Sequence, residues 1–169
     1  MLRLLGLDPG LGVTGWGIIA VAGSRLSPVA SGVIETDRTA SVPTRLCTLH
    51  EALVHLLRAY TPEEAAVEET FVNRNGASTL KLGYARGIAL LAPALAGIPV
   101  AEYAARTVKQ SLVGTGAATK EQVAMMVRRL LPGASFQRAD AADALAIAIC
   151  HAHHRSSRRL WEAADRPPA

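Results

Sequence analysis

The chain has 169 residues, 50% of them hydrophobic, and a mean hydropathy of +0.21. A chain of this length and composition buries one sizeable core and has little material for a second domain. Lys and Arg number 18 against 14 Asp and Glu, so the net charge is +4 and the sequence pI is near 9.5. A basic surface of this kind favours a polyanionic partner.

The sequence lacks the patterns of an export signal, a membrane span or a disulfide framework. The apolar start, residues 1–7, ends at Asp8 and is too short for a secretory core, and prolines interrupt the uncharged stretch 87–101. Cys47 and Cys150 form neither a close pair nor a zinc-binding spacing, which favours free thiols in a reducing compartment. We therefore expect a cytoplasmic protein with no membrane segment.

The chain begins with three expected strands joined by short turns. Residues 2–7 are an apolar run, residues 13–22 alternate small and bulky side chains, and residues 26–36 follow a Gly-Ser turn. Consecutive strands with short turns predict an antiparallel meander. Leucines at helical spacing then predict a helix over 43–60, which Thr61-Pro62 ends because proline disfavours a helical residue before it.

Short strands and helices alternate through the rest of the chain. The expected elements are strands over 65–67 and 98–103 and helices over 79–96, 106–112, 119–131 and 139–154. Thr119, with Gln122 three residues on, predicts a capping box at the start of its helix. The fold class is therefore α/β, with a five-stranded mixed sheet flanked by helices. We expect one domain over 1–154 and a basic, proline-containing tail over 155–169 that is disordered.

Asp8 stands at the end of the first expected strand, directly before a glycine-rich turn. Glycines there let another backbone or a phosphate group approach closely. Three interpretations stay open: a metal-binding carboxylate, the phosphate-binding hairpin of actin-like and sugar-kinase ATPases, and an Asx turn ahead of Pro9-Gly10. The ATPase interpretation needs a second domain, which 169 residues do not supply.

Further acidic residues lie at the ends of expected elements. Asp140 and Asp143 lie three apart at the start of the last helix, so their carboxylates share nearly one face. The helix dipole alone would explain Asp140, whereas Asp143 is followed directly by apolar residues. Glu68 and Glu69 end a buried strand, and because neighbouring strand side chains point to opposite faces, only one of them easily joins a site. Periodicity leaves that choice open.

Acids in such apolar surroundings are costly unless a positive group pairs with them, and a divalent metal is an effective partner. A metal-dependent phosphodiester hydrolase is therefore the first hypothesis. Oxygen ligands suit Mg²⁺ or Mn²⁺, and two ions side by side can activate water and stabilise the leaving oxygen.

Similarity to a known family lies in residues 6–10, 13–17, 66–71, 80–87, 102–106, 108–110 and 139–146. Together these segments resemble the RuvC family of Holliday-junction resolvases. The similarity runs in order from about residue 1 to 154, which makes it far more specific than an Asp-x-Gly motif. It implies an RNase H-like fold, a homodimer, and Mg²⁺-dependent cleavage of four-way DNA junctions by paired symmetric nicks in recombination and repair. It also implies the branch-migration proteins RuvA and RuvB as partners.

The resemblance implies roles for individual residues. The family's acidic metal ligands match Asp8, Glu68, Asp140 and Asp143, which selects Glu68 over Glu69. Basic positions near the scissile phosphate match Lys109 and Lys120, for each of which a solvated helix face is the alternative. Phe71 matches an aromatic residue of a loop that contacts bases near the crossover.

Other expectations concern DNA contacts, the dimer and a histidine cluster. Contacts to the DNA backbone are expected at Arg74, Lys81, Arg86 and Arg106. The apolar helix over 79–96 is the candidate for part of the dimer interface. Histidines near the expected end of the last helix, at 151, 153 and 154, are expected to be solvated and are left out of the site.

Two alternative functions stay open. One is another RNase H-like nuclease that acts on RNA or RNA/DNA hybrids, and the other is a catalytically inert junction-binding module. Comparing cleavage of a synthetic junction with that of a hybrid duplex separates the first from a resolvase. Metal-dependent turnover decides the second.

Overall fold

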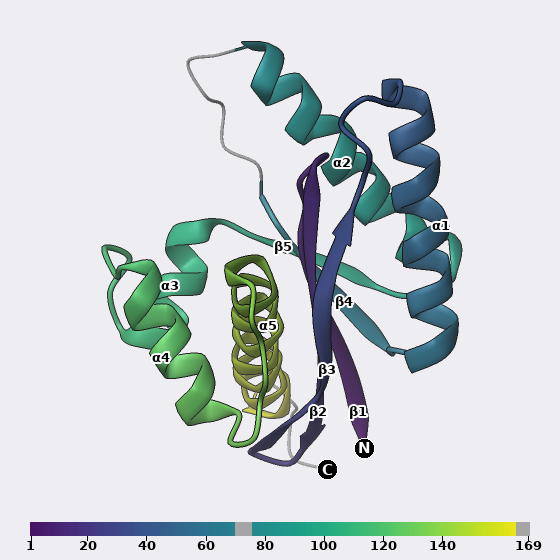
Figure 1. The fold of residues 1–169 in the computed structure, drawn as a ribbon. Helices are drawn as coiled ribbons and strands as arrows, with labels where there is room; N and C mark the ends of the chain where they lie inside the picture. The colour runs from purple at the N-terminus through teal and green to yellow at the C-terminus, as the bar shows by residue number, and fades with distance from the viewer. Residues whose placement is uncertain (70–75, 165–169) are drawn as a thin grey trace.

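The computed structural model describes residues 1–69 and 76–164, and for 156 and 158–164 it describes the backbone alone. A five-stranded mixed sheet in the order β3-β2-β1-β4-β5 forms its centre (Figure 1). Its strands are β1 (Leu2–Asp8), β2 (Val13–Ala22), β3 (Arg25–Glu35), β4 (Glu64–Glu68) and β5 (Val100–Tyr103). The first three strands pair antiparallel, β4 joins β1 in parallel, and β5 joins β4 in parallel. The expected meander and the mixed sheet are confirmed.

Helices cover both faces of the sheet (Figure 1). One face carries α1 (Val42–Tyr60) and α2 (Gly76–Leu95), and the other carries α3 (Ala105–Val113), α4 (Lys120–Leu130) and α5 (Ala139–Ala164). Alternation along β1 divides the core accordingly: Leu4 belongs to the cluster under α5, whereas Leu5 and Leu7 belong to the cluster under α1 and α2.

Glycines bring α5 directly onto the backbone of the meander. A Cβ added at Gly6 would lie 2.1 Å from the carbonyl oxygen of Ala144, and one at Gly15 would lie 2.0 Å from that of Asp140. At Gly17 it would lie 2.8 Å from the Leu145 side chain. Any larger residue would push the helix away from the sheet, so the glycines fix the position of the first turns of α5.

Most expected elements are present with ends shifted by a few residues. The capping box at Thr119 is confirmed, with Gln122 N–H donating to the Thr119 hydroxyl and Thr119 N–H donating to the Gln122 side chain. The last helix is longer than expected: α5 continues past His154 to Ala164. No glycine or proline interrupts residues 155–164, and the Arg155 side chain donates to Glu64 at 2.6 Å, which ties the extension to β4. Residues 165–169 lie outside the described part.

None of the helices within residues 1–69 and 76–164 combines the length and apolar character needed to cross a membrane.

Candidate active site

The carboxyl ends of two neighbouring parallel strands place Asp8 beside Glu68. Leu7 of β1 pairs with Val67 of β4, so the next residue in each strand is an acid at the same edge of the sheet. Glu68 is half-buried and lines the same pocket as Asp8, whereas Glu69 is exposed and its N–H donates to the carbonyl of Tyr103. The sequence left open whether Glu68 or Glu69 faces the site, and the pairing of β4 with β1 places Glu68 there.

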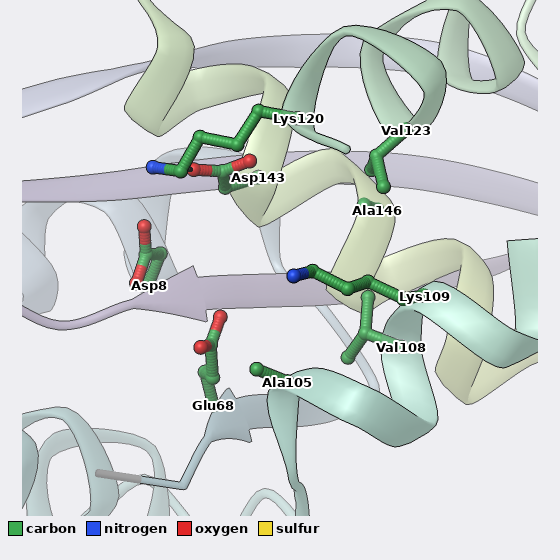
Figure 2. Close-up of a pocket in the computed structure, with 9 residues that line it drawn as sticks. All are labelled: Asp8, Glu68, Ala105, Val108, Lys109, Lys120, Val123, Asp143 and Ala146. Atoms are coloured by element: carbon green, nitrogen blue, oxygen red, sulfur yellow. Dashed lines mark hydrogen bonds and ion pairs between the residues drawn. The ribbon is translucent and has the colours of Figure 1, made fainter. Parts of the chain in front are cut away.

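A pocket of about 200 Å³ gathers five charged side chains from five elements. Its lining is Asp8, Glu68, Ala105, Val108, Lys109, Lys120, Val123, Asp143 and Ala146. Figure 2 shows the carboxylates of Asp8, Glu68 and Asp143 and the ammonium groups of Lys109 and Lys120 around one space. Three of the four predicted acids and both predicted lysines therefore meet in one place.

Burial and mutual repulsion shape the protonation of these acids. The pKa of Asp8 is raised from 3.8 to about 7, chiefly because burial disfavours the charged form, and then because Glu68 and Asp143 are near. Burial likewise raises the pKa of Glu68 and of Asp143, and Lys120 opposes the shift at both. The cluster is thus short of positive charge.

Lys120 supplies part of that positive charge. Its Nζ lies 3.5 Å from Asp143 Oδ2, and the nearby Asp143 carboxylate raises the pKa of Lys120. The lysine side chain is 75% exposed at the N-terminus of α4, so it reaches inward from solvent.

Asp140 lies apart from the pocket lining. Its carboxylate is 3.8 Å from Arg138, whose guanidinium also donates to Glu35 at 2.7 Å. Among the described residues, no three His, Cys, Asp or Glu side chains are arranged to hold a metal ion as they stand. Carboxylates without a cation repel one another, and an ionised Asp8 would add to that repulsion. The donor set itself, carboxylate oxygens in a polar pocket with raised pKa values, fits a divalent cation that prefers oxygen ligands.

Of the other predicted DNA contacts, those in the described part of the chain lie outside the pocket lining. Lys81 on α2 and Arg106 on α3 are exposed, and Arg86 is ion-paired with Glu102 of β5. The Arg86 Nε is buried, and within the described part of the chain it has no hydrogen-bond partner. Phe71 and Arg74 lie outside the described residues.

The histidines of α5 were predicted to be solvated, and for His151 this is wrong. Its ring is buried, with Nδ1 2.9 Å from the Tyr103 hydroxyl and Nε2 2.9 Å from the Glu64 carboxylate. His153 pairs with Ser111 at 3.0 Å, and the exposed His154 stacks on Tyr103. Because α5 runs on to Ala164, these residues lie within the helix and not at its end.

Some charged residues near the site were not anticipated. Arg138 bridges the end of β3 to the start of α5, and Arg38 and Arg45 lie over the turn that follows Asp8. The only signals in the sequence were that Arg138 precedes Asp140 by two positions and that the turn is glycine-rich.

A mixed sheet of this order with acids at the ends of β1 and β4 and in the first turns of α5 is the arrangement of an RNase H-like, metal-dependent nuclease. The family model described as crossover junction endodeoxyribonuclease RuvC matches residues 4–151. The chain belongs to the RuvC family.

Curated relatives with this name are similar over nearly the whole chain. The RuvC of Granulibacter bethesdensis is 68% identical over 160 residues, which cover 95% of this chain and 90% of that protein. The RuvC of Gluconobacter oxydans is 70% identical over 157 residues, which cover 93% of this chain and 94% of that protein.

Solved structures agree. Thermus thermophilus RuvC in complex with a Holliday junction substrate superposes with a TM-score of 0.87 at 35% identity, covering 94% of this chain and 97% of that one. The yeast mitochondrial Holliday junction resolvase Ydc2, at 14% identity and a TM-score of 0.64, shares the fold. The RNase H-like fold expected from the sequence is confirmed.

Proposed function

We propose that this protein resolves four-way DNA junctions by cutting two symmetric strands in a reaction that requires Mg²⁺. The observation that carries the proposal is the pocket in which acids from β1, β4 and α5 meet two lysines, in a chain of the RuvC family. The related Thermus protein was solved with a Holliday junction, which supports the same substrate here. The protein would act in the cytoplasm, and the partner proteins RuvA and RuvB would carry out branch migration.

The metal ligands in this proposal are Asp8, Glu68, Asp143 and Asp140. Asp8 would hold Mg²⁺ together with the other three acids, since the negative charge of each of them raises its pKa and a cation among them would relieve that repulsion. Bound ions would activate a water and stabilise the leaving oxygen. Mn²⁺ would substitute, because it accepts the same oxygen ligands. Asp140 would turn from Arg138 toward the pocket, and its long, partly exposed ion pair would oppose that movement only weakly.

Lys109 and Lys120 would hold the scissile phosphate. Both ammonium groups border the pocket that the acids share, so a phosphate placed against the carboxylate cluster would meet them (Figure 2). Their charge would stabilise the negative charge that builds on the phosphate oxygens during cleavage. Phe71 would stack on a base near the crossover, and Arg74, Lys81, Arg86 and Arg106 would contact the DNA backbone, as the family resemblance implies.

In the proposed dimer, one face of α2 would pack against the same face of α2 in the second protomer. Exposed apolar side chains recur along it at helical spacing: Leu80, Tyr84, Leu91 and Leu95 are 60%, 46%, 48% and 70% exposed. Gly87 lies on the same face, where it would let two helices approach closely. A two-fold dimer matches the two symmetric strands of a junction.

The test is cleavage of an end-labelled four-way junction with Mg²⁺, with EDTA and with a hybrid RNA/DNA duplex as the competing substrate. Paired nicks at symmetric positions that require Mg²⁺ are expected. Cleavage of the hybrid but not the junction would identify another RNase H-like nuclease, and binding without metal-dependent turnover would identify an inert junction-binding module. Either result would overturn the proposal.

A further inference from the structure

Thr36 anchors the turn that follows Asp8. Thr36 N–H donates to the carbonyl of Gly12 at 3.1 Å, and the buried Thr36 hydroxyl donates to the carbonyl of Leu11. The same hydroxyl oxygen accepts a hydrogen bond of 2.9 Å from Arg45 Nε. The Arg45 guanidinium is therefore fixed to the turn through a buried threonine, and among the described residues its terminal nitrogens form no hydrogen bond.

A second arginine meets the first over Gly12. A Cβ built at Gly12 would lie 3.8 Å from Arg38 Nε, 3.9 Å from Arg38 Nη2 and 3.9 Å from Arg45 Nη2. The absence of a side chain at Gly12 thus leaves open a place where two guanidinium groups come close to the same point of the backbone.

No acid among the described residues is in direct contact with this pair. Within the described residues, neither Arg38 nor Arg45 forms an ion pair of 4.0 Å or less. Asp37 is the neighbouring carboxylate: hydrogen bonds from the hydroxyl and backbone of Thr39 lower its pKa, and the charge of Arg45 adds a smaller effect from beyond ion-pair distance. Glu35, at the end of β3, is bound by Arg138.

Two like charges held beside one point repel each other, and an anion between them relieves that repulsion. Guanidinium groups bind the oxygens of a phosphate through paired N–H donors. We propose that Arg38 and Arg45, over Gly12, form a binding site for a phosphate of the DNA backbone that flanks the phosphate being cut. The inference rests on the proposed junction substrate and adds a second point of contact for its DNA backbone.

The position in the fold gives this site its role. Gly12 lies in the turn that connects Asp8 to β2, and Arg45 lies in the first turns of α1, on the opposite face of the sheet from α5. A DNA strand held here would cross the edge of the sheet where β1 ends (Figure 1). The site would orient one arm of the four-way junction on the protein, while cleavage would take place in the carboxylate pocket.

The experiment measures binding of a fluorescent four-way junction by anisotropy over a series of NaCl concentrations, with Ca²⁺ in place of Mg²⁺. The variants are Arg38→Ala and Arg45→Ala, and the matched control is Arg58→Ala, an arginine in the last turn of the same helix. Losing one phosphate contact should lower the slope of log Kd against log salt by about 0.9 in each variant. The control should keep the slope of the unmodified protein.

Arg45 also donates to Thr36, so its loss could affect folding as well as DNA binding. Thermal unfolding of the variants, including Arg45→Lys, separates these two effects. Arg38 is exposed, so Arg38→Ala tests DNA binding independently. The phosphate site would be overturned if both alanine variants kept the salt slope of the unmodified protein. If the unmodified protein still bound and cut junctions, the proposed function would remain intact. Variants that change only the state of association would also overturn the phosphate site. Unmodified protein that does not bind the junction would overturn both proposals.

Discussion

Lys120 Nζ lies 3.5 Å from Asp143 Oδ2 and so places an ammonium group beside the carboxylates of the pocket. The lysine lowers the pKa of Asp8, Glu68 and Asp143 against a larger effect of burial. Lys120 therefore supports ionisation of these three acids, and Lys109 adds to its effect on Glu68 and Asp143.

Replacing Lys120 by Met should slow junction cleavage about 100-fold, the usual cost of removing one group that stabilises developing charge. Since the acids would lose a nearby cation, their pKa values would rise further, and the rate should reach its plateau at a higher pH than in the unmodified protein. Single-turnover rates across pH check both effects. Arg129→Met, an exposed cation in the last turn of the same helix, is the control. An unchanged pH profile would contradict the electrostatic role of Lys120.

Replacing Asp8 by Asn should abolish cleavage while preserving junction binding, because the amide keeps the shape of the side chain but lacks the negative charge that holds a divalent cation. Cleavage assays together with anisotropy in Ca²⁺ measure the two properties separately. Glu69→Gln, which removes the exposed neighbour of Glu68, is the matched control and should cut normally. Cleavage that survives the loss of the Asp8 carboxylate would exclude it from the mechanism.

Without metal, the free energy of unfolding should fall as the pH rises from about 4 to about 7, because Asp8 loses its proton over this range. The folded state holds the proton up to a pKa of about 7, whereas the unfolded chain releases it near 3.8. The unfolded state therefore binds fewer protons over this range, so the free energy of unfolding decreases with rising pH and levels off above about 7. At pH 8 in EDTA, Asp8→Asn should be more stable than the unmodified protein by about 4 kcal/mol, because a shift of one pKa unit corresponds to about 1.4 kcal/mol. Thermal unfolding at several pH values tests this, and equal curves for both proteins would refute it.

Replacing His151 by Ala should destabilise the protein by about 2 to 3 kcal/mol, because Tyr103 and Glu64 would each lose a buried partner. Burial lowers the pKa of His151, although Glu64 opposes this. The unfolded chain therefore takes up a proton more readily, and unmodified protein should lose stability as the pH falls below about 6.5. The variant should lack this dependence. His154→Ala, at an exposed ring, is the control for urea unfolding at pH 5.5 and 7.5, and an equal loss in both variants would argue against the network.

Replacing Leu91 by Glu should convert the proposed dimer to monomer, because the charge would be buried at the centre of the apolar face of α2. Met125→Glu on α4 is the control, since Met125 is also an exposed apolar residue, at 60%. Analytical ultracentrifugation reports the state of each variant. A dimer that persists in Leu91→Glu would place the interface elsewhere.

Local patterns predicted most of the secondary structure. Alternation gave the meander, leucine spacing gave α1, and the Thr119–Gln122 pair gave the start of α4, because each depends on residues that are neighbours in the chain. The same reasoning failed where the environment is set by distant residues. His151 is buried because Tyr103 and Glu64 lie against α5, and neither is near it in sequence.

By itself, the sequence determined the acids, the glycines around them and the family to which they belong. Only the tertiary structure decided which of these groups meet. Gly6 and Gly15 admit α5 onto the sheet and so bring Asp143 to Asp8, while the parallel pairing of β1 with β4 turns Glu68 and not Glu69 into the pocket. Such meetings depend on packing between segments far apart in the chain, and periodicity along one segment carries no information about the segment that will face it.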